Sequence, residues 1–312
     1  VNKTDGARRA MPATLPMLLP SLIALSRKSG GFLIALDRRW PIVTSLPARR
    51  LGAERAARFE RSLASFRVNG FRPISVNFSD EMQPLAEHFT DVGIVAAEPD
   101  GVFKDRYGPS LGAAFSADPS DYCSVINADI VMLPSGIRDA MAANPEAFLV
   151  AHRLDIDAIG GSILGLYRSG IDALFFRKSR FAALLDDPDV RRFQFGAPFW
   201  DLVIPVVASF HGPVIFVEPP FILHVAHEAQ WSHSDYRILR DLALPAIVRH
   251  AERHADQPRA REFLDGFHRA VGRNPDLGAR REARMAQLVV EEWLRCIEAQ
   301  SACVIDVEIG SA

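Results

Sequence analysis

An asparagine and an aspartate interrupt an otherwise apolar run near the middle of the chain. The run extends over residues 123–133, and its two interrupting residues are Asn127 and Asp129. An apolar stretch of this length is typical of a strand buried on both faces. A carboxylate in such a strand costs free energy unless it has a partner, and a bound metal ion is one such partner. The structural alternative is that Asn127 caps the strand end and that Asp129 pairs with an arginine.

A second pair of acids, Asp155 and Asp157, follows the apolar stretch 148–150 and competes with Asp129 for the metal-binding role. Its strand is shorter, and the preceding Arg153 offers a direct salt-bridge partner. The glycines that follow predict a surface turn. Arg153 could itself contact a phosphate through its forked guanidinium. We therefore favour Asp129, and the second pair stays the alternative.

An aromatic ring and a carboxylate, Trp200 and Asp201, open an apolar helix that we predict to extend to Phe210. A ring of this kind can stack on a sugar, and a neighbouring carboxylate can accept a proton from an attacking hydroxyl. Asp201 is thus a candidate catalytic base, with Trp200 beside it as a substrate-binding residue. The helix macrodipole alone would also favour an acid in the first turn, and Trp200 could belong to the core.

Three histidines, His224, His227 and His233, lie close together after a predicted late strand at 213–217. The first two are spaced i and i+3. A histidine on an apolar strand could be a core residue, and no nearby cysteine completes a zinc motif.

Four segments of the chain, in this order, resemble the nucleotide-diphospho-sugar transferases that have the GT-A fold. The segments are 126–130, 170–177, 195–201 and 221–227, the last accompanied by Trp231. The resemblance spans about residues 30 to 237. The chain after about Leu239 lies outside it.

The resemblance implies that a sugar is transferred from a nucleotide-sugar donor to a hydroxyl of a saccharide or another acceptor. Mn²⁺ or Mg²⁺ would assist by stabilising the departing diphosphate. Asp129 would hold the ion together with His224 or His227, and Asn127 would support it through its amide. Asp172 would lie near the donor sugar or the acceptor, unless it is only a turn residue after a glycine.

Two other functions stay open. A nucleotidyltransferase or metal-dependent phosphohydrolase could use the same acidic sheet edge, but a nucleotidyltransferase would carry a glycine-rich loop after its first strand, and here Gly30 and Gly31 precede that strand. A non-catalytic relative that binds a sugar or nucleotide gains support because Asn127 stands where many relatives carry an aspartate.

Strand and helix patterns alternate along most of the chain and predict an α/β fold with a mostly parallel mixed sheet flanked by helices. The predicted strands are 32–36, 71–78, 92–96, 123–133, 147–152, 171–177 and 213–217. The predicted helices are 51–68, 79–89, 109–115, 181–185 and 200–210, with polar amphipathic helices after about Leu239. We expect a GT-A-like (Rossmann-like) domain over 1–238 and a helical C-terminal extension over 239–312 packed on it. The first strand would end at the charged residues 37–40, where a ligand could sit.

The composition is that of an ordinary globular protein, with 48% hydrophobic and 24% charged residues. A net charge of -2 gives no field that attracts nucleic acid, so nucleic acid is not an expected partner. Three cysteines are too few for a disulfide framework. The uncharged stretch 10–26 is interrupted by prolines and is short for a membrane span. We therefore expect a cytoplasmic protein without a transmembrane segment.

Overall fold

The structure is a computed structural model, which describes residues 39–48, 51–98, 107–168, 171–227, 232–272 and 279–307. Several sequence features lie outside these ranges. They are the N-terminal stretch 10–26, the expected strand 32–36, the charged residues 37 and 38, and Gly170 and Trp231.

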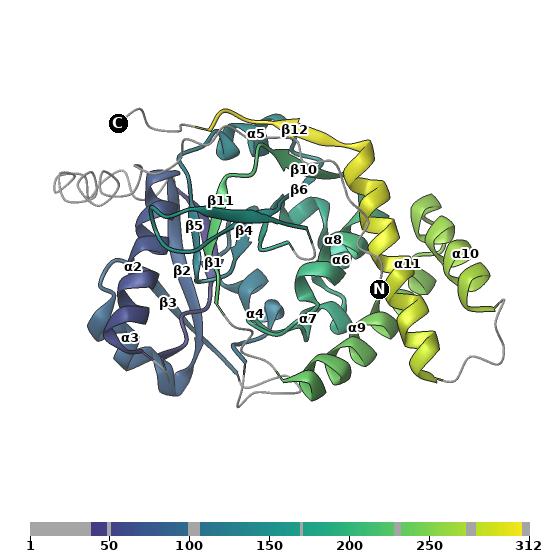
Figure 1. The fold of residues 1–312 in the computed structure, drawn as a ribbon, viewed down its shortest axis with the longest axis horizontal. Coiled ribbons are helices and arrows are strands. Elements are labelled where there is room, and N and C mark those ends of the chain that lie inside the picture. The colour runs from purple at the N-terminus through teal and green to yellow at the C-terminus, as the bar shows by residue number, and fades with distance from the viewer. Residues whose placement is uncertain are drawn as a thin grey trace.

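A mixed sheet of eight strands forms the centre of the molecule (Figure 1). Its strands are β1 (Trp40–Thr44), β2 (Phe71–Phe78), β3 (Gly93–Ala97), β4 (Tyr122–Ile126), β6 (Phe148–Ala151), β9 (Ala173–Arg177), β10 (Val214–Glu218) and β12 (Ala302–Val304). They are ordered β12-β10-β6-β9-β4-β1-β2-β3. Every neighbouring pair is parallel except those of β9, which runs antiparallel to β4 and β6.

A smaller sheet carries the polar residues singled out from the sequence. Its strands are β5 (Ile130–Met132), β7 (Arg153–Ile156), β8 (Ile163–Tyr167) and β11 (Ile222–Val225). They are ordered β5-β11-β7-β8. β11 runs parallel to β7, whereas the two outer pairs are antiparallel.

Helices gather on opposite sides of the main sheet (Figure 1). The α-helices are α2 (Ala53–Val68), α3 (Met82–His88), α4 (Leu111–Ser116), α5 (Ile137–Ala143), α6 (Ala182–Leu185), α7 (Pro188–Arg191), α8 (Trp200–His211), α9 (His233–Arg253), α10 (Pro258–Gly272) and α11 (Ala279–Gln300). Two short 3₁₀ helices are η3 (Ser79–Glu81) and η4 (Lys178–Arg180). α2 and α3 lie at one side of the view, and α9, α10 and α11 lie at the other (Figure 1).

Helix α2 shows why the local patterns predict these elements well. Phe59, Leu63 and Phe66 recur at helical spacing, and all three are buried. The helix ends at Val68 with Asn69 as its C-cap, and Gly70 follows with a φ of +77°, a left-handed conformation that glycine adopts readily. Residues 71–78 then form β2 with the bounds that we expected.

Helix α8 is apolar on nearly every side, which is typical of a helix enclosed by other elements. Its residues 202–210 are all buried, and α8 packs against α9, α10 and α11 as well as against β6 and β10. The two polar side chains at its ends, Asp201 and His211, are half-buried. α8 therefore joins the main sheet to the C-terminal helices.

The expected continuous strand over 123–133 is wrong. β4 ends at Ile126 in the large sheet, and β5 begins at Ile130 in the small one. Between them the chain turns, and the amide of Ile130 donates to the carbonyl of Asn127 over 3.3 Å. Both flanking pieces are buried, so the sequence pattern does not reveal the turn. Asp129 consequently lies in the turn, with 30% of its side chain exposed.

Several further elements differ from expectation, among them β8 and β12, which lie outside every predicted strand. Trp40 begins β1 instead of ending an earlier strand. His224 lies in β11, which follows the expected late strand, and the residues from Arg153 to Ile156 form β7 instead of a loop. These additional strands are short, so they give little periodic signal.

The expected fold class is confirmed: the chain forms an α/β structure whose mixed, mostly parallel sheet is flanked by helices. The C-terminal helices begin with α9 at His233, and the division into domains at 238 and 239 stays a prediction. Among the described residues, no helix is both long and apolar enough to cross a membrane. The cytoplasmic location also stays a prediction.

Candidate active site

The pairing of the small sheet brings Asp129 and His224 together. β11 runs antiparallel to β5, and His224 lies opposite Ile130, the residue that follows Asp129. His227 comes two residues after the end of β11 and folds back toward the same place. The three side chains therefore meet although they come from segments almost 100 residues apart.

The three side chains form a compact triangle of possible metal ligands. The Oδ2 atom of Asp129 lies 3.2 Å from Nε2 of His227 and 3.5 Å from Nε2 of His224. The two Nε2 atoms are 3.3 Å apart. Ligand atoms bound at about 2.0–2.2 Å to adjacent positions of one ion lie roughly 3.0–3.5 Å apart. The spacing of this cluster, which we call the Asp129 cluster, thus fits a single divalent ion.

The donor set also restricts the kind of ion. Two imidazole nitrogens and one carboxylate suit Mn²⁺ and the later first-row metals better than Mg²⁺, which prefers oxygen ligands. Both Asp129 and His227 are partly exposed, with side-chain exposures of 30% and 29%, so one side of the cluster is open. An open side leaves positions for a substrate or for water.

Asp155 contacts the cluster through His224. Its Oδ1 atom lies 2.9 Å from Nδ1 of His224, and the two residues are paired across β7 and β11. A carboxylate that accepts the Nδ1 proton leaves the Nε2 lone pair free to face Asp129 and a metal. Asp157 points elsewhere, because its Oδ1 accepts from the amides of Ala158 and Ser162. Neither acid of the competing pair is one of the three clustered ligands.

The pKa of the Asp129 carboxyl reflects this environment. Burial alone would raise it, but hydrogen bonds and charge from His224 and His227, whenever their Nε2 atoms carry a proton, outweigh the burial and hold the pKa well below its usual range. A divalent ion bound at these Nε2 atoms would take the place of those protons and of their positive charge. Asp129 is therefore ionised at neutral pH. It offers the anionic oxygen that a divalent cation needs.

A second group of polar residues lies beside the Asp129 cluster and centres on Arg153. Its Nη1 atom is 2.9 Å from Oδ2 of Asp172, and its Nε atom is 2.9 Å from Oδ1 of Asp155. The guanidinium also lies 4.1 Å from the centroid of the Tyr167 ring. Asn127 donates from Nδ2 to Oδ1 of Asp172 over 2.6 Å. Arg153 thus connects two carboxylates.

Asp172 is the most enclosed member of this group, with only 3% of its side chain exposed. Burial raises the pKa of its carboxyl although Arg153 lowers it. The backbone also joins it to the turn, since the amide of Asn127 donates to the Asp172 carbonyl over 3.3 Å. Asn127, Arg153 and Asp172 are therefore brought together as expected from the sequence, and their substrate-binding role stays a prediction.

Asp201 stands at the first turn of α8, within electrostatic reach of the Arg153 group. Burial raises the pKa of its carboxyl to about 7, and the negative charge of Asp172 adds to the shift, whereas Arg153 opposes it. Asp201 in turn raises the pKa of the Tyr167 hydroxyl, after burial. A carboxylate with a pKa near neutrality is suited to exchange protons at physiological pH.

Trp200 does not share this position. Its side chain is 2% exposed and contacts Phe195 edge to face within the main core. A sugar needs an exposed ring face to stack on, so we assign Trp200 to the core instead of to a substrate platform. The ring beside the charged group is that of Tyr167, which sequence reasoning missed because nothing local distinguishes it on β8.

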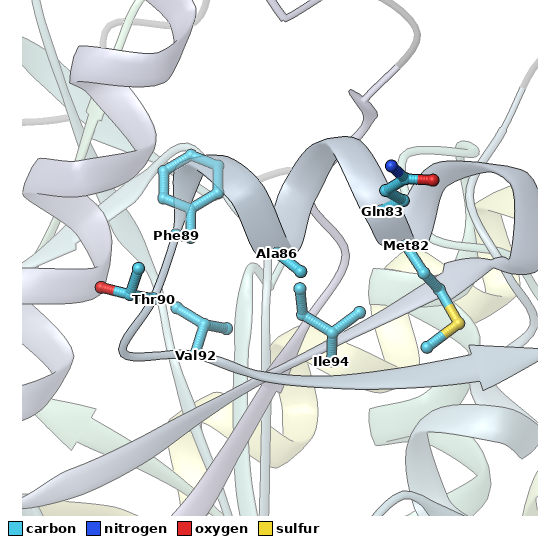
Figure 2. Close-up of a pocket in the computed structure, with 7 residues that line it drawn as sticks. All are labelled: Met82, Gln83, Ala86, Phe89, Thr90, Val92 and Ile94. Atoms are coloured by element: carbon cyan, nitrogen blue, oxygen red, sulfur yellow. The ribbon is translucent and has the colours of Figure 1, made fainter.

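A hollow in the described structure lies elsewhere, between α3 and β3 (Figure 2). It has a volume of about 460 Å³. Its lining is mostly apolar and includes Met82, Ala86, Phe89, Val92 and Ile94 (Figure 2). No titratable side chain lines it, so the chemistry points to the Asp129 cluster and not to this hollow.

Comparisons with known proteins found no matching family model and no matching curated protein. Solved structures similar to this chain are GT-A-type nucleotide-sugar transferases and nucleotidyltransferases.

Three of these structures illustrate the range. TarS residues 1–349 from S. aureus, in complex with UDP-GlcNAc, is 12% identical, covers 84% of this chain and 90% of its own, and has a TM-score of 0.49. GalNAc-T7 with UDP, GalNAc and Mn²⁺ is 12% identical, covers 80% of this chain and 55% of its own, and has a TM-score of 0.45. A putative glucose-1-phosphate thymidylyltransferase from Bacillus anthracis is 11% identical, covers 66% of this chain and 95% of its own, and has a TM-score of 0.42. Similarity at this level assigns no role to any residue.

Proposed function

We propose that the protein is a glycosyltransferase that moves a sugar from a nucleotide-sugar donor to an acceptor hydroxyl with the help of a divalent metal ion. The observation that carries the proposal is the triangle of ligand atoms from Asp129, His224 and His227, with separations of 3.2–3.5 Å. Asp201, with a pKa of about 7, provides a base near the same group of charges.

The residues of the Asp129 cluster hold Mn²⁺ in this proposal, since their two imidazoles favour it over Mg²⁺. When bound, the ion supplies positive charge that stabilises the diphosphate leaving group. Asp155 holds the His224 ring in the tautomer that presents Nε2 to the site. The protein thus supplies an anionic oxygen and two oriented nitrogens.

Asp201 is the proposed catalytic base. As the bond between the sugar carbon and the diphosphate oxygen breaks, the acceptor oxygen forms a bond to that carbon and its proton passes to the Asp201 carboxylate. Arg153, Asp172 and Asn127 line the side of the site next to Asp201. Because Arg153 already pairs with two carboxylates, its main effect is to position them and to tune Asp201.

A thermal-shift screen of UDP-, GDP-, CMP- and dTDP-sugars, with and without Mn²⁺, tests donor binding. We expect the sugars of one of these nucleotides to raise the melting temperature of the protein, and to do so only when Mn²⁺ is present. Release of nucleoside diphosphate in the presence of candidate acceptors then tests transfer. Asp129→Ala should abolish the metal-dependent shift and the turnover while the fold persists.

The matched control is Asp241→Ala, which removes an exposed carboxylate on α9 and should leave both readouts unchanged. Turnover that survives in Asp129→Ala would refute the metal assignment. Metal-dependent nucleotide binding without turnover for any acceptor would instead support a binding protein of the same fold.

A further inference from the structure

Three histidines converge where α8 and α9 end. His211 is the last residue of α8, His250 lies in the last turn of α9, and His254 is the C-cap of α9. His211 and Asp201 stand at opposite ends of α8, ten residues or about 15 Å apart along the helix axis. This histidine cluster, which we call the His250 cluster, is therefore separate from the Asp129 cluster.

Each of the three rings offers one nitrogen to the same small volume. The Nε2 atoms of His211 and His250 are 2.7 Å apart, a hydrogen-bond distance, so the two rings must separate by about 0.5 Å to bind one ion at adjacent positions. The centroid of the His254 ring lies 4.7 Å from that of His211 and 4.6 Å from that of His250. One ligand nitrogen from each residue lies within 4.8 Å of the others.

A buried carboxylate orients the central ring. His250 is fully buried, Asp187 is 2% exposed, and Nδ1 of His250 lies 2.5 Å from Oδ2 of Asp187. Because Asp187 accepts the Nδ1 proton, the Nε2 lone pair of His250 points toward His211. This is the arrangement of a carboxylate, an imidazole and a metal that recurs at metal sites in proteins.

Asp187 is itself held firmly in place. Its Oδ1 atom accepts from the amides of Asp189 and Val190 at the start of α7, and Arg253 donates to its Oδ2. The direction of the His250 ring is thus fixed by the fold before any ion binds.

A chain of hydrogen bonds without metal, from Asp187 through His250 to His211, would account for only two of the three rings. It gives no role to the nitrogen of His254. In addition, α8 and α9 both end at the cluster, and the carbonyl groups of helix C-termini favour a cation there. The spacing of His250 and His254, four residues apart at a helix end, is also common among zinc ligands.

We propose that His211, His250 and His254 form a second metal site, which takes Zn²⁺ or another late first-row divalent ion. Three imidazoles without a carboxylate ligand suit such ions and discriminate against Mg²⁺ and Ca²⁺. His211 and His254 are half-buried, so the ion can enter from solvent. The bound ion joins α8 to α9 and so fastens the C-terminal helices to the α/β core.

Zinc binding to the metal-free full-length chain, measured by calorimetry, tests this site. A His227→Gln background removes a ligand of the Asp129 cluster, so that the remaining zinc reports on the His250 cluster alone. We expect one Zn²⁺ per chain in His227→Gln and none in His227→Gln/His254→Gln. Adding His268→Gln instead, an exposed histidine on α10, should leave the zinc bound.

Two further measurements keep the test specific. Co²⁺ in the His227→Gln chain should show the visible absorption bands of tetrahedral nitrogen coordination, and these should vanish with His254→Gln. Asp187→Asn keeps one oxygen that can cap α7 but removes the carboxylate charge that orients His250, so zinc affinity should fall about 10- to 100-fold. Failure of His227→Gln to bind zinc, or equal binding with and without His254, overturns the proposal.

Discussion

His224 of β11 and Asp155 of β7 face each other across two parallel strands, with Nδ1 and Oδ1 2.9 Å apart. This pair links the two acidic motifs of the sequence, since Asp129 contacts the same imidazole from its other nitrogen. The two motifs are therefore not rivals for one role. In the proposed metal site, Asp129 supplies a ligand oxygen, and Asp155 fixes the ring that supplies a ligand nitrogen.

Asp155→Asn tests this division of roles. The asparagine oxygen can still accept from His224 and Arg153, so the geometry should persist while the negative charge is lost. We expect the Mn²⁺ affinity of the Asp129 cluster to fall about 10- to 100-fold. Calorimetric titration with Mn²⁺ measures the change.

Asp157→Asn is the matched control from the same motif. Its Oδ1 accepts only from two backbone amides of the turn, and an asparagine oxygen can replace it there. The Mn²⁺ affinity should stay that of the unmodified chain. An equal loss in both variants would mean that Asp155 acts through general charge and not through His224.

The contact between His224 and Asp155 also marks the limit of what local sequence patterns can predict. The amphipathic spacing in α2 and the apolar run of β2 are local, and their bounds could be predicted closely. The apolar run at 123–133 could not be divided correctly, because both strands that flank its turn are buried. The type and order of the candidate site residues were visible in the sequence.

Their roles depended on pairings between distant segments. Asp155 and His224 are 69 residues apart, and only the register of β7 with β11 makes them neighbours. The His250 cluster is similar: the four-residue spacing of His250 and His254 was a usable signal, but Asp187 is 63 residues from His250. Trp200 shows the opposite failure, since a residue type suited to sugar binding lies in the core.

Asp201 should give the reaction a pH dependence. A base must be deprotonated to act, and burial followed by the charge of Asp172 raises the pKa of Asp201 to about 7. We therefore expect kcat/KM for donor turnover to rise as the pH increases through about 7. In Asp201→Asn the rate should fall about 100- to 10,000-fold. The residual activity should lack this rise of kcat/KM with pH, which is the acidic limb of the pH profile. A limb that persists in Asp201→Asn would assign it to another group.

The same shift should make Asp201 costly for stability. Below about pH 3.9, the pKa of an unperturbed aspartate, the carboxyl is protonated in both states. As the pH rises toward about 7, the unfolded chain releases the proton while the folded chain retains it, so this group's contribution to stability is lost. Asp201→Asn should therefore melt at a higher temperature than the unmodified chain, with a difference that grows between pH 5 and 7 and then levels off. Calorimetry at pH 5, 6, 7 and 8 measures it, and a difference independent of pH would contradict the assigned cause.

Arg153→Met should destabilise the fold by leaving Asp172 without its cation. Asp172 is 3% exposed, and removing one partner of a buried ion pair costs about 3 kcal/mol or more. Asp172→Asn alone retains the amide-to-oxygen contact with Asn127. In the double variant Arg153→Met/Asp172→Asn no buried charge stays unpaired, so we expect it to be more stable than Arg153→Met. Denaturant unfolding of all four chains completes the cycle, and strictly additive losses would mean that the pair is not coupled.

The same two substitutions should move the pH limb of Asp201 in opposite directions. Arg153 lowers the pKa of Asp201 and Asp172 raises it. Arg153→Met should therefore shift the limb of kcat/KM to higher pH, and Asp172→Asn should shift it to lower pH. A limb that moves the same way in both variants would indicate a general loss of structure. Opposite shifts, measured with saturating Mn²⁺ so that metal binding is not limiting, would identify Asp201 as the titrating group and place Arg153 and Asp172 beside it in the working site.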